Sequence, residues 1–229
     1  MVVAGGSGSR FGRPKQFLDL AGQPVITWSV QAARSVAHGV VVVVPAGFAG
    51  DTWGADLVVE GGGTRSASVR AGLAAVPADA SVIVVHDAAR PLAGAVLFQA
   101  VVDAISAPGT DGVIPVLPVS DTLKRVSGDV VTDTLDRQGV VTVQTPQAFV
   151  ASTLRAAHAS GDEATDDAGL LEARGATVRT VPGSPTNLKL TYPEDQALAS
   201  ALVEVASALA SASASASAED QLSPDQLAR

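Results

Sequence analysis

The sequence predicts an α/β fold in which helices cover both faces of a mostly parallel sheet. Three observations support this prediction. Runs of β-branched apolar residues alternate with alanine-rich stretches of helix length along most of the 229 residues. Several of these runs are apolar throughout, as is typical of strands that are buried on both faces. In addition, 47% of the residues are hydrophobic and 17% are charged, so a single domain of this length can bury a full core.

The elements follow one another in a regular order. The predicted strands are Met1–Ala4, Val40–Val44, Asp56–Val59, Ser81–Val85, Gly112–Pro115, Thr177–Val181 and Asn187–Thr191. The predicted helices are Pro24–Val36, Arg65–Val76, Gly94–Ser106, Ala148–Ala159, Asp166–Arg174 and Pro193–Ala210. This alternation predicts a Rossmann-like, doubly wound sheet, and such sheets bind ligands beyond the carboxyl ends of their strands.

Residues 120–144 break the alternation. The segment DTLKRVSGDVVTDTLDRQGVVTVQ is polar, and the turn at Ser127–Asp129 predicts a hairpin. Because the segment is too polar for a central strand, we expect it to project as a β-arm from a single domain of residues 1–210. An isolated hairpin is only marginally stable, so we expect the arm to pack on a second copy of the chain and form a homodimer. Residues 211–229 begin with SASASASA and form a low-complexity tail, which we expect to be disordered.

Charge and composition exclude several classes of partner. The net charge of −8 disfavours binding to nucleic acid or to an anionic membrane surface, and an aromatic content of 3% provides few stacking platforms for bases. With no cysteine and three unpaired histidines, a zinc site built by the protein is not expected. We expect a cytoplasmic protein, because neither a secretory signal nor an apolar run of membrane-spanning length is present.

The strongest candidate site is the loop AGGSGSRFGRPK at residues 4–15, directly after the first strand. Its opening residues can present main-chain N–H groups to a phosphate, and two cations follow them. These residues are Ala4, Gly5, Gly6, Ser7 and Gly8, with Arg10 and Lys15 as the cations. The alternative is an ordinary strand-to-helix turn with two solvated bases. The loop matches neither the dinucleotide fingerprint nor the P-loop spacing.

Three further segments carry candidate residues. Asp87 of HDAARP follows the strand 81–85 and is suited to hold Mg²⁺ on nucleotide phosphates, or it caps a helix and pairs with Arg90. Lys189 lies between two leucines and either faces a ligand or is a solvated edge residue. Gly62 and Ser68 can read a base or ribose, although helix capping explains a serine equally well. His86 is interpreted as structural.

A series of segments along the chain resembles motifs of the 2-C-methyl-D-erythritol 4-phosphate cytidylyltransferases. In order, these segments are GSGSRFG with PKQF, GGGTRSASV, HDAARP, DTLKR, LDR, TPQAF, TDDA and NLKLT. The resemblance runs from about Val2 to Leu209. It implies transfer of CMP from CTP to the 4-phosphate of methylerythritol, with release of pyrophosphate and with Mg²⁺ as cofactor, in non-mevalonate isoprenoid biosynthesis. The alternatives are a cytidylyltransferase for ribitol 5-phosphate or another polyol phosphate, and a non-catalytic nucleotide-binding module.

The same resemblance implies a role for each matching residue. Arg10 and Lys15 are expected to stabilise the transition state and the departing pyrophosphate, and Lys189 to orient the attacking phosphate. Asp87 corresponds to the carboxylate at the magnesium and substrate site. The cytosine-recognition turn is expected at Gly62 and Ser68, and the acceptor contacts at Arg90, Thr122, Arg137 and Thr165. Of these, Thr122 and Arg137 belong to the arm and are expected to reach the active site of the neighbouring subunit.

Overall fold

A mixed, mostly parallel sheet forms the centre of the computed structural model, which describes residues 1–6, 11–12 and 14–219, with side chains up to Ser211. Its strands are β1 (Val2–Val3), β4 (Val41–Val44), β5 (Leu57–Glu60), β6 (Val82–Asp87), β7 (Gly112–Pro118), β10 (Val141–Val143), β11 (Gln147–Val150) and β12 (Val178–Pro182). The order is β10-β7-β11-β6-β1-β4-β5, and β12 pairs with β7 in parallel. Strand β11 is antiparallel to both of its neighbours, β6 and β7.

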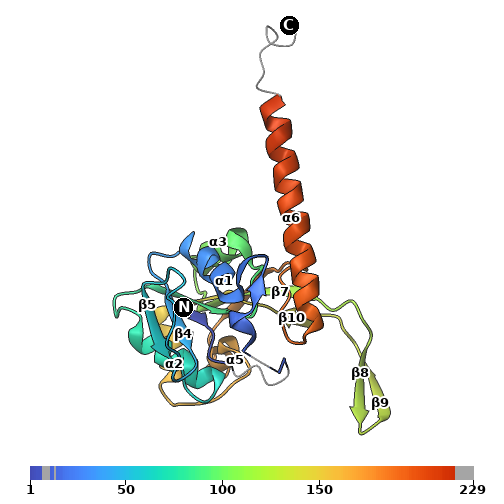
Figure 1. Cartoon of the computed structure of the whole chain (residues 1–229). Helices are drawn as coiled ribbons and strands as arrows, with labels where there is room; N and C mark the ends of the chain where they lie inside the picture. The colour runs from blue at the N-terminus through green and yellow to red at the C-terminus, as the bar shows by residue number, and fades with distance from the viewer. Residues whose placement is uncertain (7–10, 13, 220–229) are drawn as a thin grey trace, which may run out of the picture.

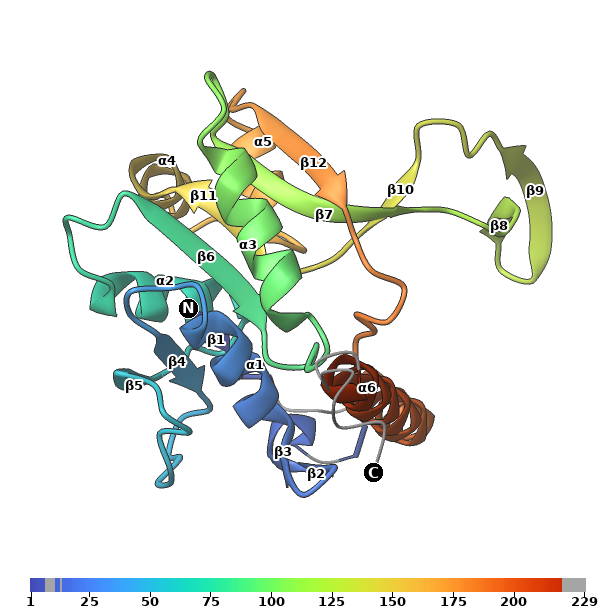
Figure 2. The ribbon, with the colours of Figure 1, turned by 90° about the horizontal axis from the view of Figure 1, so that it is seen from above.

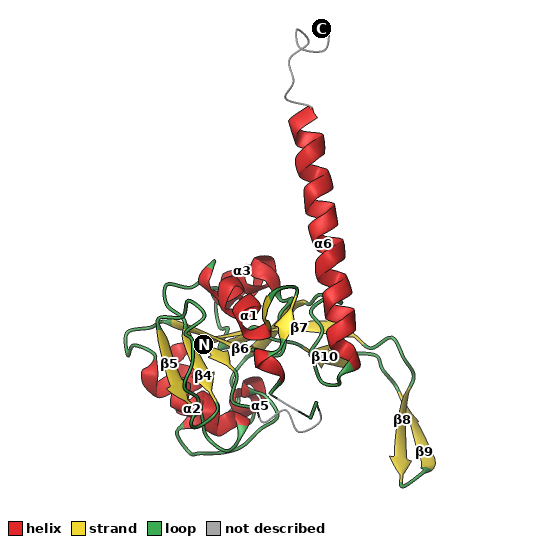
Figure 3. Cartoon of the chain, in the orientation of Figure 1, coloured by secondary structure: helices red, strands yellow, loops and turns green. Residues whose placement is uncertain are grey.

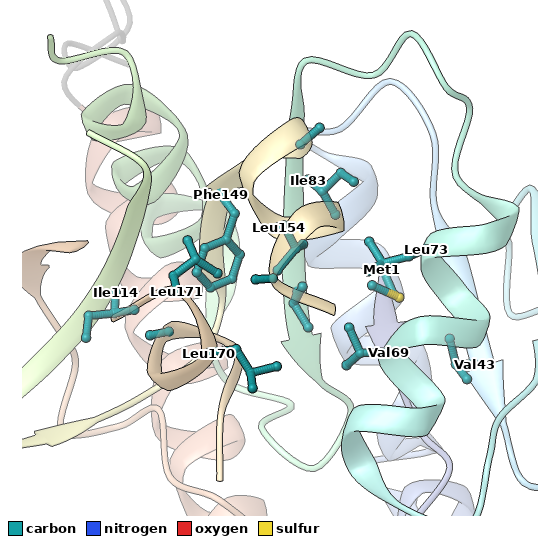
Figure 4. Close-up of a cluster of buried hydrophobic side chains, with 14 residues drawn as sticks. Met1, Val43, Val69, Leu73, Ile83, Ile114, Phe149, Leu154, Leu170 and Leu171 are labelled. Atoms are coloured by element: carbon teal, nitrogen blue, oxygen red, sulfur yellow. The ribbon is translucent and has the colours of Figure 1, made fainter. Parts of the chain in front are cut away.

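Helices pack on both faces of this sheet, as the sequence predicts (Figure 2). Helices α1 (Val25–Arg34) and α3 (Gly94–Ile105) share a core with Val42 on one face. Val43, the next residue of β4, points to the opposite face and belongs to a second core with Phe149 and Leu154 (Figure 4). Helices α2 (Arg65–Ala75), α4 (Ala151–His158) and α5 (Asp167–Glu172) enclose this core. Successive valines of one strand thus serve two cores, which is why the run is apolar throughout.

A smaller core joins the N-terminal loop region to the last helix. The short helix η1 (Lys15–Phe17) leads into a hairpin of β2 (Asp19–Leu20) and β3 (Gln23–Pro24). Helix α6 (Glu194–Glu219) packs on this hairpin, since its Ala199 and Val203 are buried in one cluster with Leu20 and Leu190. Beyond this contact α6 runs out from the body of the molecule (Figure 1).

The predicted arm is present as a hairpin of β8 (Leu123–Ser127) and β9 (Val130–Leu135). The turn contains Gly128 at a φ of +60°, a left-handed conformation that glycine adopts without steric cost. Figure 3 shows both strands standing away from the rest of the sheet. Val126, Val130 and Val131 are exposed on this hairpin.

Three predictions of secondary structure were wrong. The first residues of the predicted helix Ala148–Ala159 belong to β11, where they lie between β6 and β7; their local helix propensity is overridden by sheet pairing. Residues 187–191 form no strand, because the side chains of Arg90 and Gln144 rather than a neighbouring strand hold the main chain of Asn187 there. Helix α6 does not end at Ala210 but continues to Glu219. Alanine favours helix strongly enough to carry the alternating serines.

The rest of the tail, residues 220–229, lies outside the described part of the chain. Within the described residues, no helix is both long enough and apolar enough to cross a membrane.

Candidate active site at the carboxyl edge of the sheet

A cleft of about 540 Å³ opens where β1 and β6 end. It gathers segments that are far apart in the sequence: the glycine loop, the start of α2, the end of β6 and the segment before α6. Its lining residues are Val3, Ala4, Gly5, Gly6, Phe11, Lys15, Gln16, Gly62, Gly63, Thr64, Arg65, Ser68, Asp87, Ala88, Ala89 and Lys189. The structure therefore brings Lys15, Asp87 and Lys189 to one site, as a ligand-binding edge of a doubly wound sheet requires.

The glycine loop forms one wall of the cleft. Ala4 continues the line of β1, because its N–H donates to the carbonyl of Val43 at 2.7 Å. Gly5 and Gly6 follow it along the wall, and Lys15 lies at the start of η1. Three residues of the predicted loop site, Ser7, Gly8 and Arg10, lie outside the described residues.

Asp87 is the centre of the charge arrangement in the cleft. Its Oδ2 accepts a hydrogen bond from the Nζ of Lys189 at 2.7 Å, and its Oδ1 accepts one from the Nε of Arg65 at 3.2 Å. Burial alone would raise the pKa of Asp87, but the two cations outweigh it and hold the pKa well below its usual value. Asp87 therefore stays ionised, and its ionic partners are not the Arg90 of the capping alternative.

Arg65 connects this carboxylate to the protein core. Its Nη1 lies 2.9 Å from Oδ2 of Asp167, and Oδ1 of Asp167 lies 2.9 Å from Nε2 of His158. Burial alone would lower the pKa of Arg65, but the carboxylates of Asp87 and Asp167 raise it above its ordinary value. Arg65 is not among the predicted site residues, although its position at a helix start, two residues after a glycine run, is a usable signal.

His86 has the structural role expected for it. The imidazole is fully buried and contacts the Oγ1 of Thr145 and the carbonyl of Arg90, each at 3.1 Å. Burial lowers the pKa of His86 to about 3, so the ring remains neutral at ordinary pH. A neutral, enclosed ring fixes the turn that follows β6, and with it the position of Asp87.

Gly62 and Ser68 lie together at the start of α2. The Oγ of Ser68 donates to the carbonyls of Thr64 at 2.9 Å and of Gly62 at 3.3 Å, while Thr64 is the residue that caps the helix. A Cβ on Gly5 would come within 2.8 Å of the Ser68 Oγ. The glycine loop and the α2 turn are thus in direct contact, and this contact requires glycine.

Buried amide groups hold the segment that carries Lys189. The Nε2 of Gln144 donates to the carbonyls of Ser184 and Asn187, and the Nδ2 of Asn187 donates to the carbonyl of Thr145 at 2.9 Å. The guanidinium of Arg90 also donates to the carbonyl of Asn187, at 2.8 Å. Arg90 is predicted to contact the acceptor, but in the structure its hydrogen bonds to described residues go to main-chain carbonyls.

The arm residues of the prediction lie apart from this cleft within one chain. Arg137 donates to the carbonyl of Ser120 and lines a second hollow of about 510 Å³ at the root of the arm, with Asp136 and Gln138. Thr122 and Thr165 are exposed, and neither lines the main cleft. Thr165 precedes α5, whose Asp167 pairs with Arg65.

The cleft offers one carboxylate to a divalent cation. The described residues contain no group of three or more metal-binding side chains, and Asp87 is the carboxylate that lines the cleft. Mg²⁺ is commonly held by one or two carboxylates together with substrate phosphates, so a single Asp beside cations and main-chain N–H groups fits such a site.

Comparison with known proteins gives a consistent result. The family model of 2-C-methyl-D-erythritol 4-phosphate cytidylyltransferase (IspD) matches residues 1–205. The chain is 46% identical over 214 residues to the cytidylyltransferase of that name from Rhodococcus jostii, covering 89% of this chain and 94% of the relative. It is 44% identical to a bifunctional enzyme IspD/IspF from Granulibacter bethesdensis, over 86% of this chain, and spans about half, 54%, of that protein.

A solved structure extends the agreement to the fold. The crystal structure of 2-C-methyl-D-erythritol 4-phosphate cytidylyltransferase from Thermus thermophilus superposes with a TM-score of 0.78 at 36% identity, over 89% of this chain and 97% of that one. Sequence and fold agree, and they do not favour a polyol phosphate cytidylyltransferase of another kind. The chain therefore belongs to the 2-C-methyl-D-erythritol 4-phosphate cytidylyltransferase family of isoprenoid biosynthesis, and it is a nucleotidyltransferase.

Proposed function

We propose that the cleft holding Lys15, Asp87 and Lys189 is where this chain transfers CMP from CTP to the phosphate of 2-C-methyl-D-erythritol 4-phosphate. The observation that carries the proposal is the position of Asp87, which is bound by Lys189 and Arg65 beside the glycine loop and Lys15. Cations from opposite ends of the chain meet there around one carboxylate. A transfer between a triphosphate and a phosphate monoester requires such positive charge at both reactants.

The reaction needs no nucleophile from the protein. An oxygen of the acceptor phosphate attacks the α-phosphorus of CTP, a new P–O bond forms, and the bond to the β-phosphate breaks with release of pyrophosphate. Negative charge grows on the equatorial oxygens and on the leaving group. Lys15, together with Arg10, stabilises that charge, while Lys189 orients the attacking phosphate. Positioning and electrostatics therefore supply the catalysis.

Nucleotidyltransferases generally use a divalent cation, and we assign Mg²⁺ to Asp87. When bound there with the phosphates of CTP, the ion would offset part of their charge. The chain's own contribution is to keep Asp87 ionised and in place, through its hydrogen bonds from Lys189 and Arg65. The same two bonds keep the carboxylate directed into the cleft.

The nucleotide and the acceptor bind on different walls. The main chain of residues 4–8, with Gly62 and Ser68, receives the triphosphate and the cytosine. Thr165 and Arg90 do not line the cleft, and their part on the acceptor side is proposed from the family resemblance: Arg90 acts by holding the segment that carries Lys189. Thr122 and Arg137 come from the arm of a second subunit, since in their own chain they lie at the arm and its root rather than in the cleft. The active unit is a cytoplasmic homodimer, and a guanidinium is well suited to bind the acceptor's phosphate.

The test is release of pyrophosphate by the purified chain with CTP, Mg²⁺ and 2-C-methyl-D-erythritol 4-phosphate. Ribitol 5-phosphate serves as the competing acceptor, and UTP as the competing nucleotide. We expect turnover with the first acceptor and CTP, and at least about a hundredfold lower kcat/KM with ribitol 5-phosphate, whose backbone lacks the methyl branch. No turnover with any acceptor would refute the assignment of the cleft.

A further inference from the structure

Gln16 is buried beside the wall of the cleft that Ala4, Gly5 and Gly6 form, and its side chain binds the main chain of that wall. Only 3% of the residue is exposed, although its neighbours on either side are partly accessible. Its Nε2 donates to the carbonyl of Ala4 at 2.7 Å and to the carbonyl of Gly6 at 3.2 Å. One side-chain amide therefore holds two carbonyls of the loop, from a position ten to twelve residues farther along the chain.

These two hydrogen bonds determine how the peptide groups of the loop are oriented. In a trans peptide the C=O and the following N–H point in opposite directions. An amide that binds the Ala4 carbonyl therefore directs the N–H of Gly5 to the opposite side. A carbonyl turned toward a bound triphosphate would repel it, whereas an N–H would donate to it. Gln16 thus selects the orientation of the loop that suits an anion.

A glycine-rich loop needs such a constraint. Glycine has more main-chain freedom to lose than any other residue, so ordering Gly5 and Gly6 costs conformational entropy. If this cost falls on the binding step, affinity for the ligand is reduced. A buried side chain that fixes the carbonyls in the free protein transfers the cost to folding.

The helix that carries Gln16 is itself anchored. The ring of Phe17, the next residue, stacks on Phe48 with centroids 4.8 Å apart and on Trp53 with centroids 5.6 Å apart. Phe48 and Trp53 belong to the loop between β4 and β5. The chain has few aromatic residues, five Phe, two Trp and one Tyr, and three of them are used here. The stack holds η1, and with it Gln16 and Lys15, against the β4 side of the sheet.

We propose that Gln16 is a positioning residue for CTP, which acts by fixing the carbonyls of Ala4 and Gly6 so that the main chain of Gly5 and Gly6 is ordered before the triphosphate binds. The inference rests on the proposed function of the cleft. It assigns Gln16 no direct part in the transfer. Its loss should weaken binding of the nucleotide far more than binding of the acceptor.

Gln144 provides a matched control. Its side chain is also buried, 5% exposed, and its Nε2 also donates to two carbonyls, those of Ser184 and Asn187. That segment leads to Lys189 rather than to the glycine loop. Replacing either glutamine by methionine removes the same kind of amide and leaves a side chain of similar length. The two variants therefore differ in which wall of the cleft they disturb.

The experiment measures binding of CTP with Mg²⁺, without acceptor, by calorimetry on wild type, Gln16→Met and Gln144→Met. We expect the Kd of CTP to rise at least about tenfold in Gln16→Met, the scale set by two lost hydrogen bonds to buried groups. In Gln144→Met the Kd of CTP should rise clearly less than in Gln16→Met, because the segment that Gln144 holds reaches the nucleotide only through Lys189 and Asp87. Steady-state kinetics should show the raised KM for CTP in Gln16→Met, with the KM for the acceptor within about twofold of wild type.

Each outcome is decisive. If wild type binds CTP and Gln16→Met binds it equally well, Gln16 is only structural and the inference is wrong. Equal weakening in both glutamine variants would also overturn it, because a general loss of packing would explain that result. Failure of wild type to bind CTP would instead refute the proposed function. Should Gln16→Met not fold, Gln16→Asn keeps the amide but is too short to reach both carbonyls, and the same rise in Kd is expected of it.

Discussion

The Nζ of Lys189 lies 2.7 Å from the Oδ2 of Asp87, although 102 positions separate the two residues in the sequence. The contact is made possible by the main chain beside it, where the N–H of Leu190 donates to the carbonyl of Ala89 at 2.8 Å. The segment before α6 therefore runs alongside the turn after β6. From the sequence alone, HDAARP and NLKLT could each be explained by a purely structural role. In the structure, Asp87 of the first and Lys189 of the second lie in one site.

Removal of either lysine of the cleft should abolish most of the activity. In Lys15→Ala and Lys189→Ala we expect kcat to fall at least about a hundredfold, the scale of losing one donor to the transition state. Circular dichroism should show an unchanged fold. Arg34→Ala is the control, because Arg34 pairs with Asp56 on the surface, away from the cleft, and turnover should persist. Full activity of both lysine variants would contradict the catalytic assignment.

Mixed dimers test whether the arm completes the site of a partner. Lys15→Ala and Arg137→Ala should each be nearly inactive alone. Mixed in equal amounts and allowed to exchange subunits, they should regain up to about a quarter of wild-type activity, since half of the dimers are mixed and one of their two sites is intact. Pyrophosphate release before and after mixing measures this. If no activity returns although exchange is demonstrated, Arg137 does not act in the partner's site.

The buried pair of Asp167 with Arg65 should matter for stability. Asp167→Asn leaves the guanidinium with one carboxylate fewer inside the protein, so the free energy of unfolding should fall by about 3 kcal/mol. Urea denaturation measures the change. Asp162→Asn breaks a pair with Arg174 on the surface and should leave the denaturation midpoint nearly unchanged. Equal effects of the two substitutions would show that the buried pair contributes no more than a surface pair.

His86 should make the protein less stable in mild acid. Its pKa is about 3 in the folded protein and 6.5 in the unfolded chain, so below pH 6.5 the unfolded state binds the additional proton. The free energy of unfolding therefore decreases as the pH falls from 6.5 towards 3. Between pH 7 and pH 5 this contribution is about 2 kcal/mol, and it should be missing in His86→Gln. Parallel pH dependence of the two proteins would show that His86 is not kept neutral.

Much of the sheet can be predicted from the sequence, because an uninterrupted valine run such as Val40–Val44 directly indicates burial on two faces. Prediction from the sequence fails where tertiary pairing outweighs local preference, as in Gln147–Val150, which precede a helix and have no strand-like flanks. The position of Lys189 was left open because nothing in NLKLT shows that Asn187 and Gln144 hold its main chain. Arg65 and Gln16 were missed because their roles depend on Asp87 and on the loop carbonyls.

Helix α6 gives the molecule a rigid spacer. At the usual rise of 1.5 Å per residue its 26 residues extend over about 39 Å. Residues as far as Ala210 line a hollow together with Trp28 of the body, and the end of the helix stands away from the body (Figure 1). A fluorophore or an immobilisation handle attached near Glu219 would stand clear of the nucleotide entrance. The enzyme could thus be tethered to a surface or to a second catalyst without obstructing turnover.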